Sequence, residues 1–102
     1  MIQIRVHAEP EPQKRVLELC EALKRARVWK MNDRRCTRNL ILRHSSGTVS
    51  GTIRRVNPGA HSELQFECEA VNQAQEAITA GRFVNLVLRD MTEVSQVTIL
   101  KN

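Results

Sequence analysis

The sequence predicts an α+β protein with a mainly antiparallel sheet of about six strands and two helices on one face. Two observations support this fold class. Strand-like alternation of apolar and polar residues recurs along the chain, whereas helical periodicity is confined to two stretches. The order of these segments is β-α-β-β followed by β-α-β-β, which predicts a tandem duplication related by an approximate twofold. A chain of 102 residues is expected to form a single domain.

The first predicted repeat opens with a half-buried strand over residues 1–7, where every second side chain is apolar. Residues 13–27 then carry apolar side chains at three- and four-residue spacing, which predicts an amphipathic helix. Residues 38–44 and 48–56 are rich in β-branched residues and leucine and flank a Ser-Ser-Gly segment, so we expect a hairpin there.

The second predicted repeat opens with residues 63–70, whose sequence ELQFECEA shows the most regular alternation in the chain. Asn72 is expected to cap a short helix, and Gly81 is expected to end it. Residues 83–89 and 94–101 are predicted to form a final hairpin around Asp-Met-Thr-Glu.

The predicted repeats cover about residues 1–56 and 62–102, and three short matches in the same order support them. The matching pairs are IQIRVHA with LQFECEA, NLILR with NLVLR, and VSGTI with VSQVTI. Chance similarity is the alternative, because strands draw on few residue types. The first repeat carries extra chain that includes about residues 28–37, and connections of that length often carry function.

Positive charge is concentrated in one part of the chain. Residues 24–55 hold ten lysines and arginines against one acid, a net charge of +9, whereas the whole protein has a net charge of +5. The residues before and after this basic run are slightly acidic. A surface with such a run attracts phosphate polyanions, because each neutralised phosphate releases counterions.

Some of these cations are expected to be paired within the protein. Arg54 and Arg55 precede a strand whose outer face carries glutamates, so cross-strand ion pairs would use both charges. The expected glutamate partners are Glu63, Glu67 and Glu69. A basic face that is merely solvated or internally paired is therefore the alternative to a binding site.

Arg25 is expected to pair with Glu21 one helical turn earlier. Five of the remaining cations have no obvious acidic neighbour and are the candidate contacts with a partner. They are Arg27, Lys30, Arg34, Arg35 and Arg38. Lys24, Arg43 and Trp29 are secondary candidates. We interpret Trp29 first as a lid over the edge of the core and only second as a platform for base stacking. With so few aromatic residues, nucleic-acid binding would depend on the sugar-phosphate backbone.

No catalytic or cofactor motif is present in the sequence, so we predict neither an enzyme nor a bound cofactor. Three widely spaced cysteines predict reduced thiols rather than a disulfide framework or a zinc site. His7 and Glu69 occupy matching places in the two repeats, which leaves a metal- or ligand-binding relative of an enzyme as a distant third hypothesis, with no metal site assigned.

The first functional hypothesis is a small binding protein that docks a polyanion, namely double-stranded nucleic acid or structured RNA, through the basic patch. The alternative is a protein-interaction module, a regulator or inhibitor subunit, whose basic patch or sheet edge meets another protein. A cytoplasmic location without membrane contact is expected from the cysteine usage and from the lack of a long apolar segment. Open sheet edges also suggest a homodimer.

Overall fold

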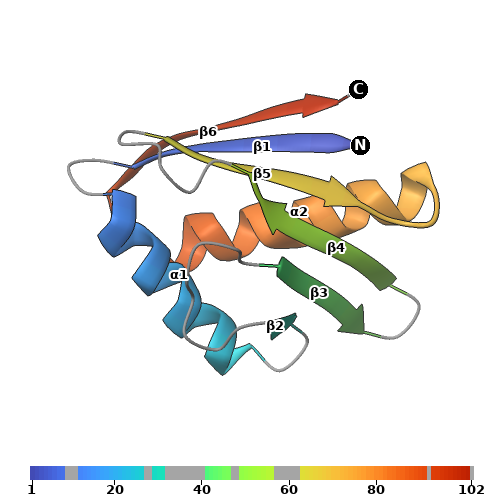
Figure 1. The fold of residues 1–102 in the computed structure, drawn as a ribbon, viewed down its shortest axis with the longest axis horizontal. Coiled ribbons are helices and arrows are strands. Elements are labelled where there is room, and N and C mark those ends of the chain that lie inside the picture. Colours follow the sequence, from blue (N-terminus) through green and yellow to red (C-terminus); the bar gives the residue numbers. More distant parts are fainter. Residues whose placement is uncertain are drawn as a thin grey trace.

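The fold is described by a computed structural model, which covers residues 1–8, 12–26, 29–31, 41–46, 49–56, 63–91 and 93–101, with the backbone only for residues 12–13, 15–16, 31 and 41–46. Strands and helices follow one another along the chain (Figure 1). In order they are β1 (Ile2–Ala8), α1 (Pro12–Arg25), β2 (Trp29–Met31), β3 (Ile41–Ser46), β4 (Val49–Arg55), β5 (Glu63–Glu69), α2 (Gln73–Asp90) and β6 (Val94–Lys101). The predicted α+β class, with two helices and an antiparallel sheet, is confirmed.

All strand pairs are antiparallel, and the strand order is β2-β3-β4-β5-β1-β6. The first strand of the chain therefore lies inside the sheet, between β5 and β6. Two β-α-β units share this sheet, β1-α1-β4 and β5-α2-β6, and each strand pair is split by a strand of the other unit. This is the split β-α-β arrangement, with the β2-β3 pair added at the β4 side.

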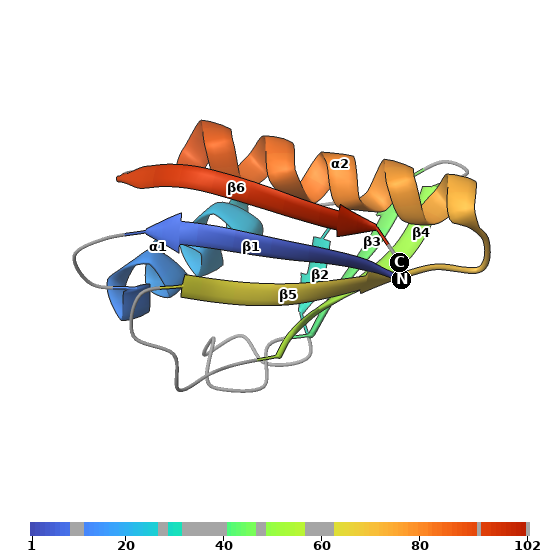
Figure 2. The same cartoon turned by 90° about the horizontal axis from the view of Figure 1, so that it is seen from above.

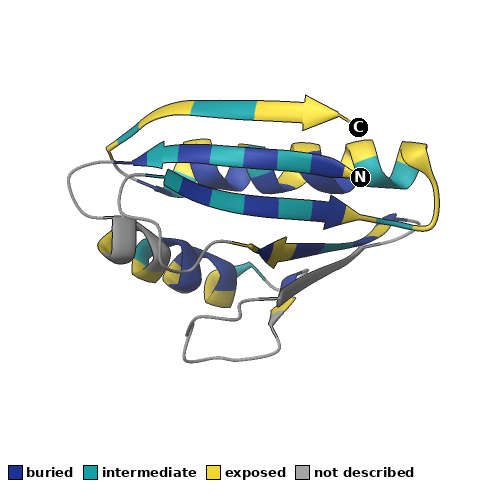
Figure 3. Cartoon of the chain, turned by 45° about the horizontal axis from the view of Figure 1, so that its top comes forward, coloured by how far each residue is buried: buried dark blue, intermediate teal, exposed yellow. Residues whose placement is uncertain are grey.

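β1 and β5, which lie in the middle of the sheet, alternate between buried and partly exposed side chains. Ile2, Ile4 and Val6 are buried on β1. The register places them opposite Cys68, Phe66 and Leu64 of β5, which are buried as well. Figure 3 shows the same alternation of buried and intermediate residues along both strands. The predicted inward and outward faces of these two strands are confirmed.

Both helices pack against the buried face of the sheet, and no helix of the described residues lies on the other face, which is called the open face below (Figures 1 and 2). The centre of this core is aromatic. The Phe83 ring of α2 meets the Phe66 ring of β5 with centroids 4.8 Å apart and the Trp29 ring of β2 with centroids 6.0 Å apart. Both contacts are edge-to-face, the geometry that aromatic quadrupoles favour.

The predicted hairpin of residues 83–89 and 94–101 is wrong in its first strand. α2 begins after the predicted cap, where the Gln75 backbone N–H donates to Asn72 Oδ1 over 2.9 Å, but it continues through Gly81 to Asp90. The reason is the spacing of its buried side chains, which recur every three or four residues and match a helix rather than a strand. They are Thr79, Ala80, Phe83, Leu86 and Val87.

The duplication is not confirmed in the predicted form. The match between NLILR and NLVLR pairs residues that lead into β3 with residues inside α2, so the two halves do not share the order β-α-β-β. The extension predicted at residues 28–37 is also not simply protruding chain, because Trp29–Met31 pairs with β3 as part of the sheet. The remaining residues of that segment lie outside the described part of the chain.

Candidate functional site

The open face of the sheet carries charges that neutralise one another. Arg54 and Glu67 lie opposite each other on β4 and β5, and the Arg54 Nη2 atom is 2.7 Å from Glu67 Oε2. This hydrogen bond and the adjacent negative charge raise the pKa of Arg54. Arg5 of β1 forms a diagonal ion pair with Glu63 of β5, with 3.6 Å between Arg5 Nε and Glu63 Oε1. The predicted cross-strand pairing is thus confirmed for Arg54, and this face is not simply basic.

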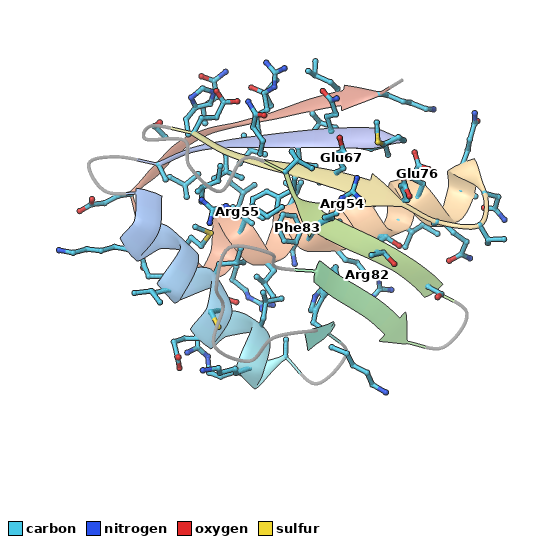
Figure 4. The ribbon with its side chains drawn as sticks, viewed as in Figure 1. Arg54, Arg55, Glu67, Glu76, Arg82 and Phe83 are labelled. Atoms are coloured by element: carbon cyan, nitrogen blue, oxygen red, sulfur yellow. The ribbon has the colours of Figure 1, made fainter. Side chains whose placement is uncertain are left out.

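The same prediction was wrong for Arg55. Successive strand residues point to opposite faces, so Arg54 and Arg55 cannot both meet the glutamates. Arg55 turns into the core opposite Phe66 and is only 6% exposed. Its burial lowers the pKa of the guanidinium, because a low-dielectric surrounding disfavours the charged form. Figure 4 shows the two arginines on β4 together with Glu67.

A groove lies on the helical side of the molecule, between α2 and the end of α1 with β2. Its volume is about 450 Å³. The lining residues are Ala26, Trp29, Ile78, Gly81, Arg82, Asn85, Leu86 and Arg89. Apolar side chains therefore form part of its wall, and two arginines with an asparagine amide supply polar groups. The apolar wall and convergent polar groups are typical of a binding site.

The polar residues of the groove come from one stripe of α2. Ile78, Arg82, Asn85 and Arg89 follow each other at spacings of three and four residues, so they share a face of the helix. All four are exposed to solvent. The neighbouring flank of the helix is fixed on β4, where the Ser50 backbone N–H donates to Gln75 Oε1 over 3.0 Å. The stripe is thus held in place by the packing of α2 on the sheet.

The charge around the groove is positive. No carboxylate of the described residues forms an ion pair with Arg82. Arg89 donates two hydrogen bonds to Asp90, from Nη2 over 2.8 Å and from Nε over 3.1 Å. This bonding lowers the pKa of Asp90, and the charges of Arg89 and Arg25 act in the same direction. Two guanidinium groups, those of Arg89 and Arg25, therefore act on one carboxylate at this end of α2.

The sequence-based candidates fall in different places. Lys30 is exposed on β2, and the register places it in one cross-strand row with Arg43, Thr52 and Glu69, on the open face of the sheet. Lys24 is exposed at the end of α1, where its Nζ atom lies 3.2 Å from Glu21 Oε1. The remaining primary candidates are outside the described residues: Arg27, Arg34, Arg35 and Arg38.

Trp29 is buried, with 6% of its surface exposed, and it packs on Phe83. It matches the interpretation as a lid on the core and is not available as an open stacking platform. Its edge nevertheless lines the groove, together with Ala26 from the end of α1. Ala26 and Trp29 both belong to the basic run of residues 24–55, so this part of the run forms one wall of the groove.

Sequence reasoning missed Arg82, Asn85 and Arg89 as site residues. Arg89 was assigned to a strand, and Arg82 was not considered, because the helix was expected to end at Gly81. The signal was present in the sequence: Arg82 and Arg89 are seven residues apart, which is about two helical turns. Only a helix extending through both positions places them on the same face.

Burial raises the pKa of the Cys68 thiol to about 11, so this cysteine is protonated at neutral pH and a poor nucleophile. Cys20 is disulfide-bonded, which differs from the expected reduced state. Among the described residues, no three His, Cys, Asp or Glu side chains come together as metal ligands. None of the described helices is long and apolar enough to span a membrane.

Comparisons with known protein families, with curated proteins and with solved structures found no match to this chain.

Proposed function

We propose that this protein is a non-enzymatic binding protein that docks a polyanion, the backbone of double-stranded nucleic acid or structured RNA, in the groove beside α2. The observation that supports the proposal is that cations from two segments, α2 and the end of α1, lie beside the same groove. Arg82 and Arg89 line the groove from α2. Lys24 and Arg25, the first cations of the basic run, lie at the end of α1, next to Ala26 on the opposite wall.

The chemistry of the groove suits phosphate groups. A guanidinium can donate two parallel hydrogen bonds to a phosphate, and its charge releases counterions from the nucleic acid. Arg82 and Arg89 stand about 10 Å apart along the helix axis, given a rise of about 1.5 Å per residue, so they can engage separate phosphates. Asn85 lies between them and adds an amide that can donate to a sugar or phosphate oxygen.

The aromatic residues favour backbone contacts over base stacking. The rings of Trp29, Phe66 and Phe83 are all buried in the core, and the chain has no other aromatic residue of these types and no tyrosine. Proteins that hold single strands usually stack bases on exposed rings. A duplex or a structured RNA, recognised through its phosphates, is therefore the better match.

We expect the double variant Arg82→Ala/Arg89→Ala to lose affinity for a fluorescent DNA duplex and for an RNA hairpin. If each arginine contacts one phosphate, the slope of log K against log salt becomes shallower by about 1.8 units, about 0.9 for each contact. Fluorescence anisotropy titrations at several salt concentrations measure both quantities. Circular dichroism would show an unchanged fold, because both side chains are exposed.

The matched control is Arg5→Ala/Arg54→Ala, which also removes two positive charges, but from the open face of the sheet. Neither of these arginines lines the groove, so we expect the salt slope to stay at the parental value. Equal losses in the two double variants would show that net charge rather than the groove determines binding. A parent protein that binds neither probe would refute the proposed function.

A further inference from the structure

The strand β6 forms an edge of the sheet that the described part of the chain leaves open. It is last in the strand order and pairs only with β1, so about half of its peptide groups point away from the sheet. Figure 1 shows β6 as the outermost strand at the top of the sheet, and Figure 3 shows that most of it is exposed. β6 is eight residues long, contains no proline, and carries its only charge at Lys101.

An apolar shelf accompanies this open edge. Ile99 of β6 is 52% exposed and Leu88 of α2 is 60% exposed. Val84 of α2 and Val97 of β6 are partly buried against the core. The inner face of β6 is only partly covered, because Val97 packs against the core whereas Ile99 is more than half exposed. Large apolar side chains next to an open strand edge are costly in water and indicate a covered surface.

The charges at the two ends of this edge are self-complementary. Glu93 precedes β6 and Lys101 ends it, with no other charged residue between them. When two such strands pair antiparallel about a twofold axis near their middle, the Glu93 end of each copy lies beside the Lys101 end of the other. Two ion pairs therefore form at once, whereas a parallel arrangement would bring like charges together.

We propose that a second copy of this chain docks on the free edge of β6, giving a twofold-symmetric dimer whose sheet continues across the β6–β6 contact. A twofold axis perpendicular to the sheet keeps the helices of both copies on the same side. With Glu93 opposite Lys101, Ile99 of each copy lies opposite Ser95 of the other copy and loses part of its contact with water. The interface is isologous, since each strand offers the same residues to its partner. It lies on the flank of α2 opposite the basic groove, so it is independent of the polyanion proposal.

The test is a charge swap, followed by sedimentation velocity over a range of protein concentrations. Lys101→Glu alone and Glu93→Lys alone each replace two attractions with two repulsions, so we expect the dimer dissociation constant to rise about tenfold in each. The double variant Glu93→Lys/Lys101→Glu restores opposite charges across the interface and is expected to return the dissociation constant close to the parental value.

A second pair of variants tests the apolar shelf. Ile99→Lys places a charge on the edge strand and is expected to make the protein monomeric. Leu17→Lys is the matched control, since Leu17 is 58% exposed on α1, away from β6, and this variant should dimerise like the parent. A monomeric parent, a dimer that survives Ile99→Lys, or a double charge swap that remains as weak as the single variants would overturn the proposal.

Discussion

Phe83→Ala is expected to destabilise the protein by about 3–5 kcal/mol, the usual cost of deleting a fully buried aromatic ring. Phe83 has no exposed surface and contacts the rings of Phe66 and Trp29. Its removal leaves a cavity where α2, β5 and β2 meet. The change also removes the ring on which Trp29 packs, and Trp29 is one of the residues that line the groove.

Urea denaturation followed by circular dichroism measures this change, and Ile78→Ala on the same helix is the control. Ile78 is 42% exposed, so its truncation should cost much less than that of Phe83. Leu86→Ala and Val87→Ala extend the test. In a helix both residues are buried, as observed, whereas neighbours in a strand would face opposite sides of the sheet. A low cost for either would contradict the helix and favour the hairpin expected from the sequence.

The parts of the fold that the sequence predicted are those with one clear period. β1 and β5 alternate at every second residue, and α1 repeats its apolar side chains at helical spacing. In each of these segments the spacing of apolar residues fits only one type of secondary structure. The side chains predicted to face the core are therefore the ones that are buried. Asn72 was also identified correctly, because the capping bond depends on local residues alone.

The segment at 83–89 could not be assigned in this way. Its valines and leucines are compatible with a strand, and Gly81 is a common stop signal for a helix. What selects the helix is tertiary: Phe83, Leu86 and Val87 complete a core that exists only when the sheet has formed. Local propensity was overruled by packing, as often occurs for short apolar segments.

The similarity between the two halves illustrates the same limit. IQIRVHA and LQFECEA lie on β1 and β5, and VSGTI and VSQVTI lie on β4 and β6. These strands occupy equivalent positions in the two β-α-β units. The third match joins a strand region to a helix, so identical letters there carry no common structure. Whether two matching segments occupy equivalent positions depends on the strand order. Strand order is set by long-range pairing and cannot be read from a short sequence match.

Of the candidate site, only the excess of positive charge could be predicted from the sequence, and the residues that line the groove could not. The excess of lysine and arginine in residues 24–55 is visible in the sequence, and it pointed to a polyanion. Which cations share a surface depends on the fold. Arg54 is neutralised across strands and Arg55 is buried, whereas Arg82 and Arg89, from outside the run, line the groove.

Gly51→Ala is expected to destabilise the protein by about 1–3 kcal/mol, because Thr79 of α2 leaves no room for a Cβ atom at this glycine of β4. A Cβ atom at position 51 would lie 2.7 Å from Thr79 Cβ, which is closer than carbon atoms can approach without displacement. Thr79 cannot easily move, since it is fully buried and its hydroxyl donates to the Gln75 carbonyl over 2.7 Å. The helix would have to shift away from the sheet, and the groove stripe next to this contact would shift with it.

Gly81→Ala is the matched substitution with the opposite expected sign. A Cβ atom at position 81 meets no other atom within 4 Å, and glycine lowers helix stability, so alanine should stabilise the protein by about 0.5–1 kcal/mol. Urea midpoints of the two variants provide the comparison. Adding Thr79→Ala to Gly51→Ala should recover only part of the loss, because Thr79 Cβ itself occupies the space. Equal stability of the parent and Gly51→Ala would mean that α2 does not rest on β4 at this position, and the placement of Arg82 and Arg89 would have to be revised.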